Sequence, residues 1–324
     1  MVGGEEDSER SSEARRPWTV GWAATVQAPP LPDHRRRIPR TGRPTNYGAT
    51  LRVGEAFRYD LTFAGNPAGI AEARIAAFQL DPRGRPPLGA PTVRLEGHAQ
   101  TSGIVSLLAT VTDDMVSIVD AQTGATVSST STIHYSGWAS AQFKHRVTEH
   151  VYHGRGYIQI TDTRDGDRKR KARYVPLDTF DPLSAMAWVR SLPLEAGQRA
   201  KAHVVDGTTL MRFEVESKGR RRLEAMPSVA TALGVDPDDA ILLEGVLTRV
   251  DRYGQPIPGK RSFEMRAWLS GDERRLPLLL ESDMWVGAVR LTLTGYDPPR
   301  DRPADAASPR EGTALPAKSD AAVP

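Results

Sequence analysis

The stretch from residue 261 to residue 296 constrains the fold most, because apolar and polar side chains alternate along it. Every second position is apolar over residues 263–269 and again over residues 289–293, on either side of a tight corner at residues 268–277. An alternation with a period of two places the apolar side chains on one face of a strand and the polar ones on the other. The pattern predicts β-sheet with one buried and one solvated face.

A β-hairpin is predicted near the start of the patterned region. Phe57, Tyr59, Leu61 and Phe63 alternate with polar residues, and a Gly-Asn-Pro-Ala turn at residues 65–68 follows them. The second strand of this hairpin is predicted over residues 69–80, and further strands over residues 92–101, 115–119 and 125–135, with a turn at residues 120–124. Strand follows strand without long helices.

Two Asp-Gly pairs predict further hairpins of type I′, because such turns need positive φ at both central positions. They are Asp165–Gly166 and Asp206–Gly207. The tip of the first hairpin, residues 164–173, is dense in Arg and Lys. This tip is either a solvated end that charge keeps soluble, or a contact for phosphate or another polyanion.

One segment, residues 181–191, departs from the strand pattern and predicts a short helix of about three turns. Asp181 can cap its free N–H groups, Pro182 suits its first position, Ser184 follows in the first turn and Pro193 ends it. A helix this short needs tertiary packing, so we expect it to plug the concave side of a curved sheet.

The whole chain is therefore predicted to be mainly β: a strongly curved antiparallel sheet, an incomplete barrel or β-spiral, around one short helix. The β-rich domain is expected over residues 51–297. Residues 1–50 and 298–324, rich in Arg, Pro, Glu, Ser and Ala, are expected to be a disordered arm and tail. Residues 15–28 are either a degenerate signal segment, which five acidic residues precede where positive charge is expected, or simply part of the disordered arm.

Composition excludes several classes of function. The chain contains no cysteine, which rules out disulfides, thiolate zinc sites and thiol nucleophiles. No run of 18 apolar residues exists, so no transmembrane helix is predicted. With 43 basic and 40 acidic residues the net charge is +3, too small a field to indicate specific nucleic-acid binding. No nucleotide-binding loop occurs, so no cofactor is expected. Among the histidines, His150 and His153 would point to opposite faces of a strand, and no metal site is expected.

Four pieces of the sequence together resemble one bacterial family, known as domain of unknown function 3108. The pieces are residues 54–59, Asp120 with Thr123 and Gly124, residues 181–194, and residues 268–277 followed by residues 286–289. The resemblance covers about residues 50–297. At the corner, Gly271 stands where the family usually has an Asp, which puts an ion-binding role of the corner in doubt. Family members look like exported envelope proteins of Gram-negative bacteria without an established enzymatic activity, and their pattern resembles the open or spiral β-barrels of periplasmic carriers.

The candidate site is a cleft lined by Tyr59, Trp188 and Trp268, with Arg190, Asp272 and Arg275 as a polar rim. Such a cleft would suit an amphipathic ligand such as a lipid or glycan. The competing interpretation of the rim is a structural ion pair between Arg190 and Asp272 that orients the helix. Ser270 and Pro277, like Asp181 and Ser184, are interpreted as structural residues of the corner and the helix.

These observations predict a non-enzymatic, periplasmic or envelope-associated protein that supports envelope integrity. Its partner would be a lipid, a glycan or an envelope protein. The alternative is a hydrolase or lyase acting on envelope glycans, with Asp181, Asp272 or Glu273 as acid or base. That alternative requires two carboxylates facing one cleft about 5 to 9.5 Å apart.

Overall fold

The computed structural model describes residues 50–80, 91–103, 106, 109–137, 144–153, 156–284 and 287–300. The expected signal segment at residues 15–28 lies outside these residues. So do the expected arm and tail, apart from Thr50 and the three residues after Asp297.

The described residues form fifteen strands, two α-helices and one short 3-10 helix. The strands of the first half are β1 (Ala56–Phe63), β2 (Asn66–Leu80), β3 (Pro91–Thr101), β4 (Ala109–Asp120), β5 (Thr126–Gly137), β6 (His145–His153), β7 (Tyr157–Arg164) and β8 (Asp167–Tyr174). The second half consists of β9 (Thr179–Phe180), α2 (Pro182–Ser191), β10 (Arg199–Asp206), β11 (Thr209–Arg220), α3 (Ser228–Ala232), η3 (Pro237–Asp239), β12 (Ala240–Arg249), β13 (Ser262–Ser270), β14 (Pro277–Met284) and β15 (Gly287–Asp297).

All fifteen strands belong to one sheet, in the order β8-β7-β6-β5-β4-β3-β2-β1-β15-β14-β13-β12-β11-β10-β9. The first and last strands, β1 and β15, pair in the middle of the sheet, while β8 and β9 lie at its two edges. Every pairing is antiparallel except that of β9 with β10. The sheet is not closed, which confirms the predicted mainly β fold with an incomplete barrel.

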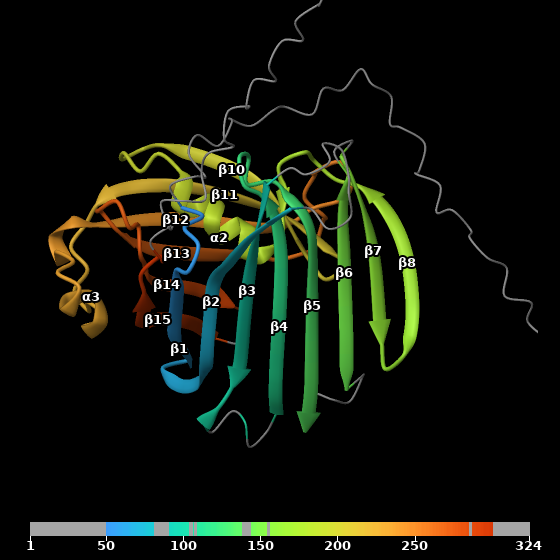
Figure 1. Cartoon of the computed structure of the whole chain (residues 1–324), viewed down its shortest axis with the longest axis horizontal. Coiled ribbons are helices and arrows are strands. Elements are labelled where there is room, and N and C mark those ends of the chain that lie inside the picture. Colours follow the sequence, from blue (N-terminus) through green and yellow to red (C-terminus); the bar gives the residue numbers. More distant parts are fainter. Residues whose placement is uncertain are drawn as a thin grey trace, which may run out of the picture.

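The sheet folds over into two layers whose strands run in different directions (Figure 1). Strands β1–β8 stand side by side in one layer, and β10–β15 cross behind them. Helix α2 contacts β3 and β4 of the first layer as well as β9 and β10 of the second. The short helix thus lies between the layers, where it fills the concave side of the sheet.

The main apolar core surrounds Trp188 of α2, whose side chain is 4% exposed. Its ring stacks on Phe180 of β9 with the centroids 5.9 Å apart and meets the edge of Phe213 of β11 at 6.1 Å. Val93 and Leu95 of the first layer pack into the same cluster. Because a helix of ten residues is marginal in water, this packing is what keeps α2 folded.

The N-terminus of α2 is fixed by hydrogen bonds as well as by packing. The Asp181 carboxylate accepts from the Leu183 and Ser184 N–H groups at 2.9 and 3.2 Å, and the Ser184 hydroxyl accepts in return from the Asp181 N–H at 3.0 Å. Ser117 of β4 also donates to this carboxylate, at 2.6 Å. The cap therefore anchors the helix to the first layer.

The end of the β10–β11 hairpin is covered on both faces. Val204 and Val205 are adjacent and so point to opposite faces of β10, yet they are buried in different apolar clusters. Val205 packs with Ile158 and Ile160 of β7, and the His150 ring of β6 lies 2.6 Å from the Gly207 carbonyl oxygen. The β6–β8 edge therefore wraps over the hairpin, as expected of a spiral.

Three local features differ from the sequence predictions. The first hairpin turns at Ala64 and Gly65, which both have positive φ, and β2 already begins at Asn66, so the turn lies before most of the predicted residues 65–68. Asp165 and Gly166 both have positive φ, as a type I′ turn requires, but in the other Asp-Gly hairpin only Gly207 does. Asp206 stays in β10 and pairs with Thr209, so Gly207 becomes the first central residue, the position that glycine takes in a type II′ turn. Helices α3 and η3 were not predicted, because residues 221–239 carry no sustained helical period.

Replacing Trp188 by alanine tests the importance of the core around α2. We expect Trp188→Ala to lower the free energy of unfolding by about 3–5 kcal/mol, because a large cavity would open between the two layers. Urea denaturation followed by far-ultraviolet circular dichroism measures this change. As a control, Leu177→Ala, at a side chain that is 62% exposed, should change it by less than about 0.5 kcal/mol. Equal effects of the two substitutions would contradict a central role of the Trp188 core in stability.

Candidate functional site

A buried ion pair connects the start of the sheet with the end of helix α2. Glu55 directly precedes β1, and Arg190 lies in the last turn of the helix. Their side chains are 0% and 3% exposed, and Nη2 of Arg190 lies 2.9 and 3.1 Å from the two carboxylate oxygens of Glu55. Burying two charges is costly unless all their hydrogen-bonding groups find partners.

The Glu55 carboxylate is satisfied by three donors. Besides Arg190, Nη2 of Arg52 donates to Oε1 at 2.7 Å and the Tyr296 hydroxyl donates to the same oxygen at 3.0 Å. Tyr296 belongs to β15, the last strand of the sheet. The carboxylate thus joins β15, α2 and the segment before β1.

The guanidinium of Arg190 also has hydrogen-bond partners on all sides, and besides Glu55 these partners are backbone carbonyls. It donates to Thr50 at 3.2 Å, to Arg274 at 2.9 Å and to Arg275 at 3.1 Å. Its guanidinium also lies over the Phe57 ring, 4.8 Å from the ring centroid. Because Arg274 and Arg275 belong to the corner between β13 and β14, Arg190 fixes this corner to the helix.

Arg275 makes the reverse contact, from the corner to the helix. Its Nη1 donates to the carbonyls of Arg190 at 2.7 Å and Leu192 at 2.8 Å, which occupies two acceptors at the C-terminal end of α2. The residue has a φ of +49°, a strained conformation for arginine, and these contacts help to hold it.

The predicted ion pair between Arg190 and Asp272 does not form, since the carboxylate partner of Arg190 is Glu55. Asp272 instead turns into its own corner, where it accepts from the Ser270 hydroxyl at 2.7 Å and from Nε of Arg274 at 2.7 Å. Burial by itself would raise the pKa of Asp272, but the hydrogen bonds from Arg274 and Ser270 outweigh it and the pKa is lowered. Asp272 is therefore an ionised structural residue of the corner.

Gly271, the departure from the family's usual corner, has a steric reason. A Cβ atom at this position would lie 2.3 Å from the backbone oxygen of Asp239 and 2.6 Å from its carboxylate. An Asp would therefore clash with η3 and add a second negative charge beside the first. The close approach of η3 to the corner accounts for the glycine.

The structure does not gather the three aromatic residues of the predicted cleft around one hollow. Trp188 belongs to the core around α2, whereas Tyr59 is buried in a second cluster that Trp268 packs against. Burial raises the pKa of Tyr59 well above its ordinary value. All three pack against the apolar interior, and a ligand-binding role for them stays a prediction.

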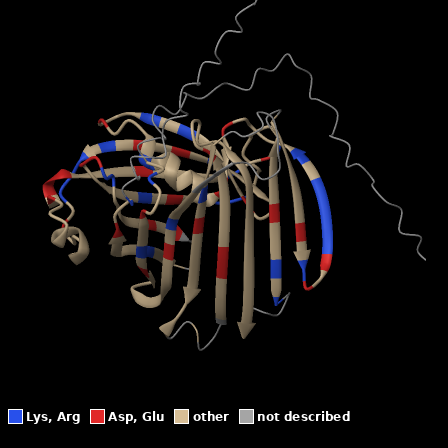
Figure 2. Cartoon of the chain, viewed as in Figure 1, with Lys and Arg blue, Asp and Glu red and all other residues tan. Residues whose placement is uncertain are grey.

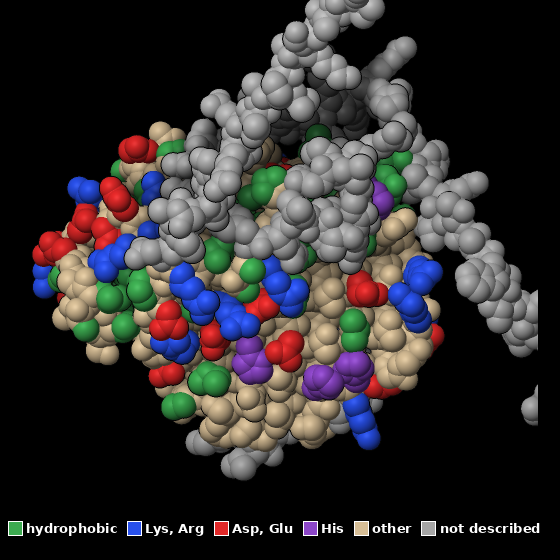
Figure 3. All heavy atoms as spheres, viewed as in Figure 1, with side chains coloured by type: hydrophobic (Ala, Val, Ile, Leu, Met, Phe, Trp, Pro, Cys, Tyr) green, Lys and Arg blue, Asp and Glu red, His purple; other side chains and the backbone are tan. Residues whose placement is uncertain are grey.

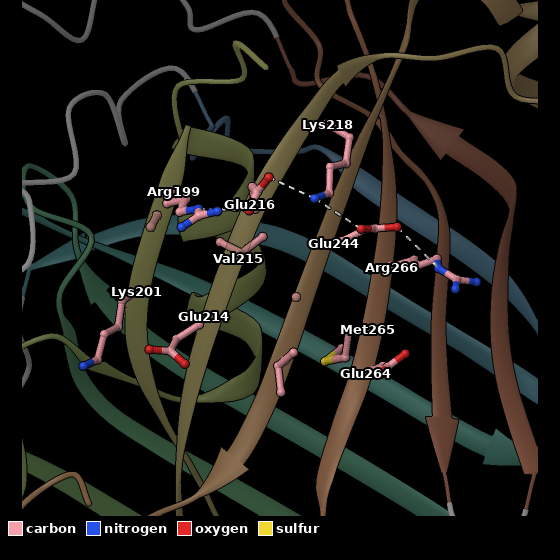
Figure 4. Close-up of a pocket in the computed structure, with 13 residues that line it drawn as sticks. Arg199, Lys201, Glu214, Val215, Glu216, Lys218, Glu244, Glu264, Met265 and Arg266 are labelled. Carbon is pink, nitrogen blue, oxygen red and sulfur yellow. Dashed lines mark hydrogen bonds and ion pairs between the residues drawn. The ribbon is translucent and has the colours of Figure 1, made fainter. Parts of the chain in front are cut away.

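A different hollow is found on the far side of the second layer, across β10, β11, β12 and β13 (Figure 4). It is a groove of about 880 Å³. Its charged lining residues are Arg199, Lys201, Lys218 and Arg266, with Glu214, Glu216, Glu244 and Glu264. We call it the β10–β13 groove. It carries four positive and four negative side chains, so it is electrically balanced.

Ion pairs run across the strands of the β10–β13 groove in an unbroken ladder. Arg199 and Lys218 each lie 2.9 Å from Glu216, and Lys218 also reaches Glu244 at 3.5 Å. Arg266 completes the ladder, 3.9 Å from Glu244. The hydrogen bond from Lys218, followed by the one from Arg199, lowers the pKa of Glu216. The ladder was not predicted, because the cross-strand register that pairs these charges is not visible in the sequence.

No metal site emerges from the part of the chain that the structure describes, where no three His, Cys, Asp or Glu side chains gather as ligands. His98 contacts Asp114 at 2.8 Å, and His134 stacks on His145 with the ring centroids 4.5 Å apart. Figure 3 shows histidines on the exposed face of the first layer. In the same described residues, neither helix has the length and apolar character needed to cross a membrane.

A family model described as "Protein of unknown function (DUF3108)" matches residues 58–294. The chain belongs to this DUF3108 family. A solved structure with a similar fold is the beta-barrel-like protein of domain of unknown function DUF1849 from Brucella abortus, at 12% sequence identity and a TM-score of 0.51. The match covers 76% of this chain and 98% of the Brucella chain, and it shows likeness of fold alone. No curated protein matches the sequence.

Removing the charge of Glu55 should strongly destabilise the protein. We expect Glu55→Gln to lower the free energy of unfolding by about 3–5 kcal/mol, because Arg190 would remain charged and buried without a counter-charge. Urea denaturation measures the loss. The control is Asp297→Asn, which breaks the exposed ion pair with Arg58 and should cost less than about 1 kcal/mol. A Glu55→Gln loss no larger than that of the control would contradict a structural role for the buried pair.

The stability of the fold should also depend on pH in the alkaline range, because the Tyr296 hydroxyl is hydrogen-bonded to the Glu55 carboxylate. Burial, and then the Glu55 charge, raise the pKa of Tyr296 from 10.0 to about 12. A raised pKa means that the neutral phenol stabilises the fold below pH 10, and that this contribution is lost as the pH rises from 10 to about 12. We expect unfolding free energies measured across this interval to fall less steeply for Tyr296→Phe than for the native protein. Equal slopes would contradict the prediction.

Proposed function

We propose that this protein is a non-enzymatic binding protein of the bacterial cell envelope that holds an uncharged glycan chain in the β10–β13 groove. The observation that carries the proposal is the balanced ladder of ion pairs in that groove. Because its positive and negative side chains are equal in number, the groove exerts little net attraction on a charged ligand. A polar but uncharged polymer suits it better.

The groove offers a glycan both hydrogen-bonding groups and apolar contact. Its carboxylates accept and its Lys and Arg side chains donate, and hydrogen bonds to charged groups are the stronger kind. The cross-strand pairs hold these groups in position before a ligand arrives, which reduces the entropy lost on binding. Val246, which is 38% exposed, adds an apolar surface within the groove. The groove spans four strands spaced about 4.8 Å apart, enough for an extended chain of several sugar units.

The filled interior of the sheet also supports an external site. Trp188 and its neighbours occupy the space between the two layers, where a carrier with an internal cavity would hold its ligand. The envelope location is supported by the resemblance described above, whose members look like exported proteins.

The arrangement of carboxylates favours binding over hydrolysis. Glycoside hydrolysis needs one carboxyl group that stays protonated beside a second that is ionised. Neighbouring cations lower the pKa of Glu216, and Glu244 is paired with Lys218 and Arg266. Asp181 is buried in the helix cap, and Asp272 is engaged by Ser270 and Arg274 within its corner, so neither is free to act as an acid or base.

A second candidate, a partner protein, is favoured by the open edge of β10. Strand β9 pairs with β10 only at His203 and Val204. Within the described residues no strand covers the edge of residues 199–202, which could accept a strand from another chain. Such a strand would bind through backbone hydrogen bonds, so substitutions of the groove's charged side chains would hardly weaken it.

Binding of a neutral oligosaccharide tests the proposal. We expect N-acetylchitotetraose, a soluble chain of uncharged amino sugars, to bind the native protein in isothermal titration calorimetry. The substitution Glu244→Gln should raise the dissociation constant about 5- to 20-fold, because a charged acceptor and the middle of the ladder are lost.

The matched control is Glu281→Gln, which removes the carboxylate of a cross-strand pair with Arg290 outside the groove. It should leave the dissociation constant unchanged within twofold. Absence of binding to the native protein, or equal weakening by the two substitutions, would contradict a glycan site in the β10–β13 groove.

A further inference from the structure

The edge strand β8 is the most basic element of the described chain. Its eight residues, Asp167–Tyr174, include five Lys or Arg side chains. The strand pairs with β7 alone and forms one margin of the sheet. Figure 2 shows most of this strand in blue, interrupted by a tan band near its end. Charged residues, including ones that point inward, protect an edge strand from aggregation, and this is the competing explanation of the cluster.

Three of these cations, Lys169, Lys171 and Arg173, lie on the face of β8 that turns toward the core. In the register of β7 and β8, Lys171 lies opposite Ile160 and Arg173 opposite Ile158. Residues opposite each other in an antiparallel pair share a face, and both isoleucines are buried. Lys171 and Arg173 therefore extend the buried face of β7 at the open margin of the sheet.

Further cations lie on the same face, but they are already neutralised. Arg146 of β6 lies opposite Arg164 of β7, and both contact the carboxylate of Asp162, at 2.7 and 3.0 Å. Asp162 itself lies opposite Lys169, which pairs with Asp167 at 3.0 Å. The acidic groups of this face are thus fully engaged by other cations.

Lys171 and Arg173 form no ion pair in the described part of the chain. Arg173 donates to the Thr208 carbonyl at 3.2 Å, and Asp251 favours its charge without pairing with it. Burial, and then the charge of Arg173, lower the pKa of Lys171. An anion at this point would provide the missing counter-charge to both cations.

The geometry points to a linear anionic glycan, carrying carboxylate or phosphate groups, as the ligand of Lys171 and Arg173. Alternate residues along a strand lie about 6.6 Å apart, so the two cations can contact charged groups on an extended chain. We name these two side chains the β8 cation pair. The site uses other strands than the β10–β13 groove, and the inference does not depend on the function proposed for that groove.

Two other polyanions fit the site less well. A bilayer surface is flat, whereas the β8 cation pair lies on the inward face, where Arg173 is partly covered. Single-stranded nucleic acids bind by stacking their bases on aromatic side chains beside a basic groove. The tyrosines of β7 and β8, Tyr157 and Tyr174, lie opposite each other, one position along from Ile158 and Arg173. They are therefore on the other face of the sheet.

The test is binding of an oligogalacturonate, a carboxylated glycan, by the full chain in fluorescence anisotropy. We expect the affinity to fall as salt rises, and the fully methyl-esterified oligomer, which is uncharged, to bind at least tenfold more weakly. The double substitution Lys171→Gln/Arg173→Gln should weaken binding of the charged oligomer at least tenfold.

The matched control, Arg168→Gln/Arg170→Gln, removes the same charge from the other face of the same strand and should weaken binding less than threefold. Equal losses in the two double variants would overturn the inference, because they would indicate non-specific attraction to the edge. Tighter binding of single-stranded DNA or of phosphatidylglycerol vesicles, lost in the Lys171→Gln/Arg173→Gln variant, would also overturn it.

A second measurement uses the unsubstituted protein and so does not depend on the variants folding. Reductive methylation followed by mass spectrometry reports the reactivity of each lysine. We expect the charged oligomer to protect Lys171 at least fivefold while leaving Lys218 of the β10–β13 groove equally reactive. Unchanged reactivity of Lys171 at saturating oligomer would overturn the inference.

Discussion

The ion pair between Glu55 and Arg190 is the contact on which the rest of the structure depends. It lies where the segment before β1, the last strand β15, the helix α2 and the β13–β14 corner meet. The sheet has its first and last strands paired in its middle, so this point joins the two halves of the chain. The Glu55 carboxylate and the Arg190 guanidinium hold the helix in place between the layers, because both groups are fully hydrogen-bonded.

The packing around that helix decides where the protein can bind anything. Because α2 and its apolar neighbours fill the concave side, the ligands that we propose are assigned to the outer faces and the open margins of the sheet. Two such places differ in charge: the β10–β13 groove is balanced, whereas the β8 cation pair lacks a counter-charge. An uncharged polymer would therefore bind in the β10–β13 groove, and an anionic polymer would bind at the β8 cation pair.

The elements could be predicted from the sequence better than the contacts between them. Alternation, Asp-Gly turns and the Asp181 cap are local signals, and each led to the correct strand, hairpin or helix. Glu55 and Arg190 are 135 positions apart, and no local pattern marks their pairing. Asp272 was proposed as the partner of Arg190 because it lies in the adjoining corner, but Arg274 competes for it from two residues away. The groove was missed because the ladder from Glu216 to Arg266 depends on register across three strands.

A double-mutant cycle on the buried pair tests most directly whether it organises the structure. Unfolding free energies would be measured for Glu55→Gln, Arg190→Met and the double variant. If the two charges support each other, removing both costs much less than the sum of the single losses, with a coupling energy of about 2–3 kcal/mol. A coupling energy near zero would contradict the account, because the two side chains would then stabilise the fold independently.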